Sequence, residues 1–494
     1  MVICMLMLPY FSSGCSSSYE DPHQPLTGTS SGPPDCTPGD DSIALRAECG
    51  KFVSSSKGDD GPDSDGSPEK PFATITRATS SQKEGPIYLC AETFTEALHV
   101  KEEVTIYGGL DCEAGDWKWI GDTKRSEISP DSGDIPLVLD LGVSATIEDV
   151  VFRAKDAVEP GGSSIAILAT SGSQLELARC HVEAGNGADG FSGEAFGLSA
   201  ATGVLGNSGM PACSGPMIFG GGSVTNACDE ADQNDNSISG SGGIGQEAIG
   251  SAGSPGTPLG TMNGGTGQLD DVATCTNGTP GDSGTPGASG TGAQGTGTIT
   301  AQGYAGAAGS TGTKGKPGQG GGGGGGAKGG AGAGKCADMA SAGGASGGSG
   351  GSGGCGGAGG KGGQAGGASI GILSLGATLV FADVKISANN GGNGGDGGAG
   401  QLGGMGGPGG TGGSKGNAVS LDNGCSGGPG GNGGTGGRGG GGLGGHSIGI
   451  AYNDRPPSAD GATITIGSAG DGGAGEGDAG NGAPGTAGMT RSFL

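Results

Sequence analysis

Three short stretches place reactive or ligating residue types at spacings that chemistry could use. Residues 329–336 read Gly-Gly-Ala-Gly-Ala-Gly-Lys-Cys, which departs from a phosphate-binding loop because Cys336 stands where a hydroxyl would hold magnesium. Ser349 lies between two glycine pairs, as the nucleophile of a serine hydrolase does. Residues 391–399 match most of a calcium-binding nonapeptide, but Gly398 replaces its apolar residue. No apolar strand precedes the first two stretches and the third is a single copy. High glycine content therefore explains all three, and we predict no cofactor and no metal.

The histidines offer no further site. His23, His99, His181 and His446 are scattered along the chain, and no two of them have the spacing of metal ligands. We assign them no role.

The thirteen cysteines indicate an oxidising compartment, because a chain with so few aromatic residues uses disulfides to support a small core. No Cys-x-x-Cys motif occurs, which disfavours zinc knuckles and thioredoxin-type redox sites. The sequence does not fix the connectivity. Pairs with plausible loop spans are Cys90 with Cys112, Cys213 with Cys228, and Cys336 with Cys355.

A short apolar pattern returns four times and supplies the elements that would position any site. The copies begin at Leu137, Ile165, Ile370 and Ile448, and apolar residues occupy alternate positions within each short run, which predicts strands. Each unit holds about three strands that are too short to bury a face alone, so the copies must stack. This pattern predicts an all-β protein with a parallel β-helix. The fourth copy crosses a polar loop at residues 453–460 and is expected to lack its final strand.

Long glycine-rich excursions separate the copies. Residues 185–368 and 389–446 form the two large insertions, and residues 155–164 form a short one. Each leaves after the last strand of a copy, so one corner of the stack would carry all three. Residues 471–494 form a glycine-rich tail. Within the excursions glycine recurs every third residue, which matches the three residues per turn of polyproline II geometry. A bundle of polyglycine II helices and a disordered linker both remain open. Collagen is disfavoured because it requires more proline and longer runs of triplets.

Composition limits the partners and the location. The net charge of −26 opposes contact with a nucleic-acid backbone or an anionic membrane. Residues 1–15 form an apolar run that ends in Ser-Ser-Gly-Cys, which is similar to a bacterial lipoprotein signal and implies lipidation of Cys15; an ordinary cleaved secretory signal is the alternative. Residues 16–47 would be a flexible tether. We expect an exported protein at the cell outer membrane or cell surface, which touches the membrane only through the lipid.

The segment 48–184 resembles the amino-terminal part of pectate-lyase-like right-handed β-helix proteins. The resemblance rests on Gly-Lys-Phe-Val at 50–53, the Asp/Gly turns at 58–67, Pro-Phe-Ala-Thr-Ile-Thr-Arg-Ala at 71–78 and Val-Thr-Ile-Tyr-Gly-Gly at 104–109. It implies a short capping helix at 72–78, followed by the first rungs and by later rungs at 369–388 and 447–470. In composition the excursions are similar to the glycine-rich repeats of mycobacterial PE-PGRS proteins. The helical domain that defines those proteins is missing, so no function is transferred.

The same resemblance supplies the enzymatic alternative, because β-helix lyases use strand carboxylates with calcium and an Arg or Lys base. Local candidates are Asp149, Arg153, Lys155 and Asp156, while a later rung offers only Asp383 and Lys385. Charges on the outer face of a strand explain these residues without catalysis. We therefore predict a non-catalytic surface protein, structural or adhesive, that binds a polysaccharide or surface protein. The alternatives are a carbohydrate-active lyase or hydrolase and ice or surface binding, for which only Thr463 and Thr465 offer a ladder.

Overall fold

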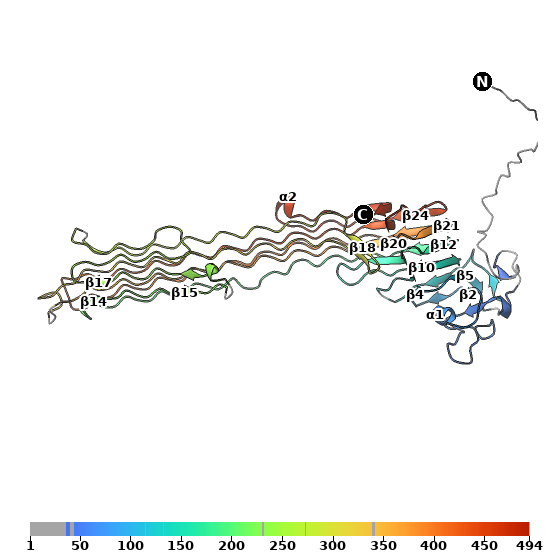
Figure 1. Ribbon diagram of the computed structural model, residues 1–494, viewed down its shortest axis with the longest axis horizontal. Helices are drawn as coiled ribbons and strands as arrows, with labels where there is room; N and C mark the ends of the chain where they lie inside the picture. The colour runs from blue at the N-terminus through green and yellow to red at the C-terminus, as the bar shows by residue number, and fades with distance from the viewer. Residues whose placement is uncertain are drawn as a thin grey trace, which may run out of the picture.

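The structure is a computed structural model that describes residues 36–39, 44–113, 115–131, 133–229, 232–271, 273–337 and 341–493. Figure 1 shows two parts: a block of stacked strands, and a long arm of extended segments that lie side by side and project from one side of the block. Cys15 and His23 lie outside the described residues, as do the predicted signal and most of the predicted tether.

Three parallel sheets build the block. Sheet A contains β1 (Lys51–Val53), β2 (Ile87–Cys90), β5 (Val104–Asp111), β9 (Ser144–Glu148), β12 (Gln174–Ala178) and β21 (Thr378–Ala382), with β6 (Lys118–Trp119) antiparallel to β5. Sheet B contains β3 (Thr93–Phe94), β7 (Ser126–Ile128), β10 (Val150–Arg153), β13 (His181–Glu183), β22 (Val384–Ala388) and β24 (Ala462–Ile466). Sheet C contains β4 (Leu98–Val100), β8 (Leu137–Leu139), β11 (Ser164–Ala169), β20 (Ser369–Leu375), β23 (Ser447–Asn453) and β25 (Ala487–Ser492).

The repeats follow one another in register. From β8 to β22 the block strands visit sheets C, A and B in turn, and each new strand adds to its sheet in parallel. Ile147, Leu177 and Phe381 occupy the same position in successive strands of sheet A and belong to one buried cluster that all three sheets share. The alternation read from the sequence therefore places its apolar set inside, and the protein is all-β with parallel sheets.

A glycine makes the turn from sheet C to sheet A in three repeats. Gly142, Gly172 and Gly376 have φ values of 71°, 71° and 85°. A side chain strains the backbone in this left-handed region, so glycine at these places keeps the repeats superimposable.

The fourth repeat differs from the prediction. Strand β24 pairs with β22 in sheet B, so the repeat lacks its strand in sheet A, and residues 454–461 form a loop there. The final strand that was expected to be missing is therefore present. The tail also contains β25, which extends sheet C beside β23. The sequence missed β25 because Ala-Gly-Met-Thr-Arg-Ser shows no apolar alternation.

Short helices complete the block. Helix α1 (Ile75–Thr79) begins after the N-cap Thr74, whose side chain accepts from the Arg77 amide, and it buries Ile75 and Ala78 against β1, β2 and β4. A short helix was predicted at 72–78, and the structure has one that begins three residues later. The 3-10 helix η2 (Ala47–Cys49) carries Cys49, which is bonded to Cys36. The described end of the predicted tether is thus packed on the block. No helix in the described part of the chain is long and apolar enough to cross a bilayer.

The arm consists of residues 185–368, 389–446 and 467–486, which leave sheet B and return to sheet C at the same corner. The common corner was predicted for the first two segments, whereas residues 471–494 were expected to be a tail. It holds only short pieces of regular structure. These are β14 (Met217–Ile218), β15 (Thr225–Asn226), β16 (Ser237–Ile238), β17 (Gly245–Gln246), β18 (Thr298–Thr300), β19 (Gly303–Ala305), η3 (Gln233–Asp235) and α2 (Gly477–Gly480). The remaining segments are extended and joined by backbone hydrogen bonds.

Candidate functional site

A charged cleft of about 610 Å³ lies where the arm leaves the block. The ends of β10, β13 and β22 and the loop after β10 form it. Its polar lining consists of Arg153, Lys155, Asp156, Glu183, Ser387 and Asn389. Three of the four predicted catalytic candidates therefore lie together.

The charges in this cleft pair with one another. Arg153 bonds Glu127 with an Nε–Oε1 distance of 3.1 Å and also contacts Glu183. Lys155 Nζ lies 3.2 Å from Asp131 Oδ1, and Asp156 accepts from the backbone and side-chain nitrogens of Asn186. A base that holds a proton-abstracting position needs a free lone pair, which a paired Arg or Lys does not offer. Both basic side chains of the cleft are therefore engaged by carboxylates.

Asp149, the fourth candidate, lies at another corner. It is buried between β9 and β10, where its carboxylate accepts from Arg179 Nη2 at 2.8 Å and from Trp119 Nε1 at 2.8 Å. Burial alone would lower the pKa of Arg179, but hydrogen bonds and attraction to Asp149 and Glu148 outweigh it and raise that pKa. Burial raises the pKa of Glu148. This cluster holds the turn together and does not reach the cleft.

The later-rung candidates are separated as well. Asp383 occupies the corner equivalent to Asp149 and Arg179, and all three have φ between 50° and 58°. Lys385 lies beside His181 on the outer face of sheet B. Burial and the nearby Arg125 and Lys385 lower the pKa of His181.

The three motifs singled out in the glycine-rich segments have structural roles. Ser349 is fully buried, and its Oγ accepts from the Asn207 amide at 2.8 Å, so no substrate reaches it. Cys336 is disulfide-bonded. In the nonapeptide, the side chain of Asn393 accepts from the Asp471 amide and that of Asp396 from the Ala474 amide. These side chains bridge neighbouring segments of the arm.

Five disulfides join the described cysteines. Cys90 pairs with Cys112, as suggested from loop span. The two other suggested pairs are exchanged: Cys213 bonds Cys336 and Cys228 bonds Cys355. Two further bonds join Cys36 to Cys49 and Cys275 to Cys425. Loop span misled because segments that are far apart in the sequence lie side by side in the arm. Cys180 is free but buried, and burial raises its pKa to about 12.

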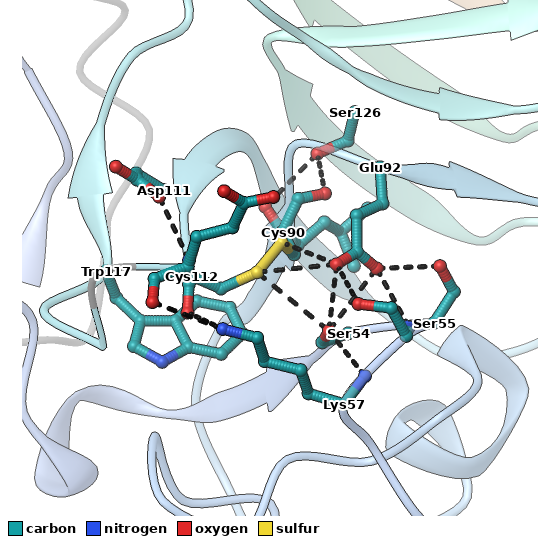
Figure 2. Close-up of a disulfide and its surroundings, with 12 residues drawn as sticks. Ser54, Ser55, Lys57, Cys90, Glu92, Asp111, Cys112, Trp117 and Ser126 are labelled. Carbon is teal, nitrogen blue, oxygen red and sulfur yellow. Dashed lines mark hydrogen bonds between the residues drawn. A yellow bond between two sulfur atoms is a disulfide. The ribbon is translucent and has the colours of Figure 1, made fainter.

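Figure 2 shows the Cys90–Cys112 disulfide, with Glu92 directed at it. Glu92 Oε1 lies 3.1 Å from Cys90 Sγ, and the carboxylate accepts from the hydroxyls of Ser54, Ser55 and Ser56. Burial alone would raise the pKa of Glu92, but the serine hydrogen bonds outweigh it and hold the pKa below its usual value. Cys90, Glu92 and Cys112 are the only group within the described residues whose geometry could hold a metal ion, and the disulfide occupies both sulfurs.

The arm has two central segments, residues 318–327 and 345–352. The first donates backbone hydrogen bonds to three neighbours and accepts from three others, with the neighbour changing at each successive residue. The neighbours of the first are residues 237–246, 251–257, 263–268, 276–282, 345–351 and 424–431. Residues 345–352 are surrounded in the same way by residues 204–210, 221, 240–243, 321–324, 407–410 and 425–428.

Segments that have more neighbouring segments contain more glycine. Residues 320–326 are all glycine and all buried. A Cβ would lie 1.7 Å from Asn263 O at Gly322, 1.9 Å from Ser241 O at Gly323 and 2.1 Å from Cys425 O at Gly324. Outer segments such as residues 278–290 keep glycine only at every third position. The sequence thus encodes how deeply each segment is buried.

Comparison of the chain with protein-family models, with curated proteins and with solved structures gives no match.

Proposed function

We propose that the three sheets close into a right-handed parallel β-helix. From β8 to β22 the chain visits the three sheets in a constant order, and their inner side chains form one buried cluster, as such a closure requires. Connections between parallel strands are right-handed in nearly all proteins, which supports this hand.

We further propose that the arm is a polyglycine II bundle. A helix with three residues per turn directs successive residues to different neighbours, which is the pattern of hydrogen bonds around residues 318–327. The alternative from the sequence was a disordered linker. Hydrogen exchange separates them: protection of the amides of residues 320–326 comparable to that of β11 supports the bundle, and exchange within seconds rejects it.

The function that this geometry supports best is a non-catalytic, exported surface protein with a structural or adhesive role. The observation that carries it is the arm: a hydrogen-bonded rod that holds its tip far from the block (Figure 1). The five disulfides and the acidic charge suit an oxidising exterior. Lipidation of Cys15 would anchor it. The partner would be a polysaccharide or a protein of the cell envelope or its surroundings.

Surface display tests this proposal. An epitope tag inserted after Gly416, a residue with open space on its side-chain face, should be accessible to antibody on intact bacterial cells. The same tag in the loop at residues 454–461 serves as the control near the block. A Cys15→Ser variant should lose incorporated fatty acid and be released. A tag that is detected only after cells are permeabilised would reject surface display.

Adhesion needs its own measurement. Cells that display the chain should bind beads coated with envelope polysaccharide, and a Gly323→Asp variant, which disrupts the arm, should lose that binding. Equal binding by the unaltered protein and the Gly323→Asp variant would show that the arm does not mediate adhesion.

The cleft favours one alternative, a carbohydrate-active enzyme, because Arg153 and Lys155 lie beside Asp156 and Glu183 next to sheet B. Incubation with polygalacturonate or alginate would give an unsaturated uronate, read by its ultraviolet absorbance. Product that disappears in Arg153→Ala would replace the non-catalytic proposal with this one.

A further inference from the structure

One edge of the arm carries an unusually apolar surface. Residues 198–210 and 402–411 run side by side there, with Ala200, Gly203 and Gly206 amides bonded to the carbonyls of Leu402, Met405 and Pro408. We name the apolar strip by its large exposed side chains: Leu205 (60% exposed), Leu402 (65%) and Met405 (68%).

These side chains share one face. The Ser208 and Thr411 hydroxyls lie 3.0 Å apart, which fixes the phase of the two segments. Moving back three residues in both segments places Leu205 beside Pro408. Moving back three more places Thr202 beside Met405. Leu198 and Met210 lie on another face, because Asn207, which shares their phase, bonds Gly222 O through its side chain. Leu402, Met405 and Pro408 follow one another along one segment, and Leu205 lies beside Pro408. The strip is therefore continuous and not a scatter of single residues.

The strip is also free of charge. No Asp, Glu, Lys or Arg occurs in residues 195–228 or 397–414, although the whole chain carries 72 such residues. The opposite outer segment, residues 278–291, exposes Thr, Ser, Pro and Asp instead. Exposed apolar patches of several hundred Å² on soluble proteins mark interaction sites, and Leu205, Leu402 and Met405 lie together at the exposures given above.

From this placement we propose that the apolar strip binds the same strip on a second copy of the chain. The triplet repeat spaces outward side chains by about 9 Å along the arm, so the ridges of one strip match the grooves of a partner with the same repeat. A second copy has that repeat and the same apolar surface, and a two-fold axis across the strip makes the contact self-complementary. This inference does not depend on export or adhesion.

Charge favours this occupant over an anionic membrane. Two copies with a net charge of −26 each repel one another, and the uncharged strip is where they approach without placing like charges in contact. An anionic bilayer would repel the whole arm. Association through the strip should consequently tighten as salt screens the remaining repulsion.

Sedimentation of the intact chain tests the proposal. We expect a monomer–dimer equilibrium in the micromolar range that shifts toward dimer between about 50 mM and 500 mM NaCl, because salt shortens the screening length. The double variant Leu205→Asp/Met405→Asp should weaken association at least about 100-fold, since it buries two charges per copy. The matched control Thr285→Asp/Ala288→Asp adds the same charges to exposed positions on an outer segment that does not bond residues 402–411, and should leave association unchanged. Unaltered hydrogen exchange at residues 320–326 establishes that both variants keep the arm.

Three results would overturn the proposal. The chain could remain monomeric at roughly 100 µM, where even weak specific interfaces associate. It could form a dimer that both double variants weaken equally. It could stay monomeric and co-sediment with phosphatidylcholine vesicles in a manner that Leu205→Asp/Met405→Asp abolishes, which would make the strip a lipid-binding surface.

Discussion

At the scale of single residues, the molecule uses two ways to pack chains closely. In the arm, a missing side chain lets backbones hydrogen-bond directly, and the third residue of each triplet supplies an oxygen for the next segment, as Asn393 does for Asp471. In the block, a charged cluster holds one corner, where Arg179 joins two acidic side chains. Both devices leave little tolerance for substitution.

Replacement of Gly323 by alanine should destabilise the arm by about 3 kcal/mol, at the upper end for overpacking, because its Cβ meets the fixed backbone carbonyl of Ser241. Gly197 has open space around its Cβ position, so Gly197→Ala is the matched control and should change stability by under about 0.5 kcal/mol. Hydrogen exchange of the arm amides measures both. Equal protection in the two variants would contradict the close packing of residues 320–326.

Replacement of Arg179 by methionine should cost about 3–5 kcal/mol, because it leaves the buried Asp149 carboxylate without its cation. Arg153 also joins two acidic side chains but is 47% exposed, so Arg153→Met should cost under about 1 kcal/mol. Urea unfolding of the block, followed by tryptophan fluorescence, compares the two. A larger loss for Arg153→Met would assign the structural role to the cleft.

At the scale of elements, the strands and segments are specified unequally. Strands such as β12 and β21 carry the alternation that predicts them, whereas β25 lacks it and depends on its neighbours. Fully buried His446 is one of these neighbours: its Nδ1 accepts from the Thr486 amide, just before β25, and its Nε2 lies 2.8 Å from Thr296 O. The ring is therefore neutral, with its proton on Nε2.

Acid should release β25. Burial lowers the pKa of His446, so the unfolded state binds a proton more readily than the folded state does. The contribution of His446 to stability is then complete above the unfolded pKa of about 6.5 and falls as the pH drops below it. The protection factors of the β25 amides, which correct for the slower intrinsic exchange in acid, should fall between about pH 7 and pH 5, and His446→Gln should remove that pH dependence. The same fall in protection in His446→Gln would place its cause elsewhere.

At the scale of the whole molecule, the block fixes the direction of the arm and the arm sets the reach. Three excursions leave the block at one corner, so their segments start in register with the strands and continue side by side (Figure 1). The disulfides Cys213–Cys336, Cys228–Cys355 and Cys275–Cys425 join segments within the arm itself. The arm thus continues the stacking of the block, but its segments are joined by hydrogen bonds between extended glycine-rich backbones and not by the pairing of strands in sheets.

Small-angle X-ray scattering should report an elongated particle. Residues 389–414 form one uninterrupted segment that spans about 80 Å at 3.1 Å per residue. We expect a pair-distance distribution with a long tail of that order beyond the block, unchanged by moderate heating. A distribution that varies continuously with temperature would indicate that the segments are not held together.

The sequence alone determined the strand repeats, the common corner and the triplet phase, because each depends on residues close together in the chain. Alternation marks Ile165 and Ile370 as equivalent, which their pairing confirms, and glycine at every third position predicts a segment with three residues per turn. The resemblance that named the cap also predicted helix α1. For the site, it selected Arg153, Lys155 and Asp156, which the fold does bring into one cleft.

Only the tertiary structure decided which segments are neighbours. Many glycine segments have nearly the same composition, and backbone hydrogen bonds do not distinguish among them, so local sequence cannot choose the partner of residues 320–326. For that reason Cys213 and Cys228 have partners 123 and 127 residues away. Asp149 does not line the cleft with the other candidates, for a related reason. Its backbone turns at a corner between two strands, which directs its side chain toward Arg179, and the strand pattern in the sequence does not predict that corner.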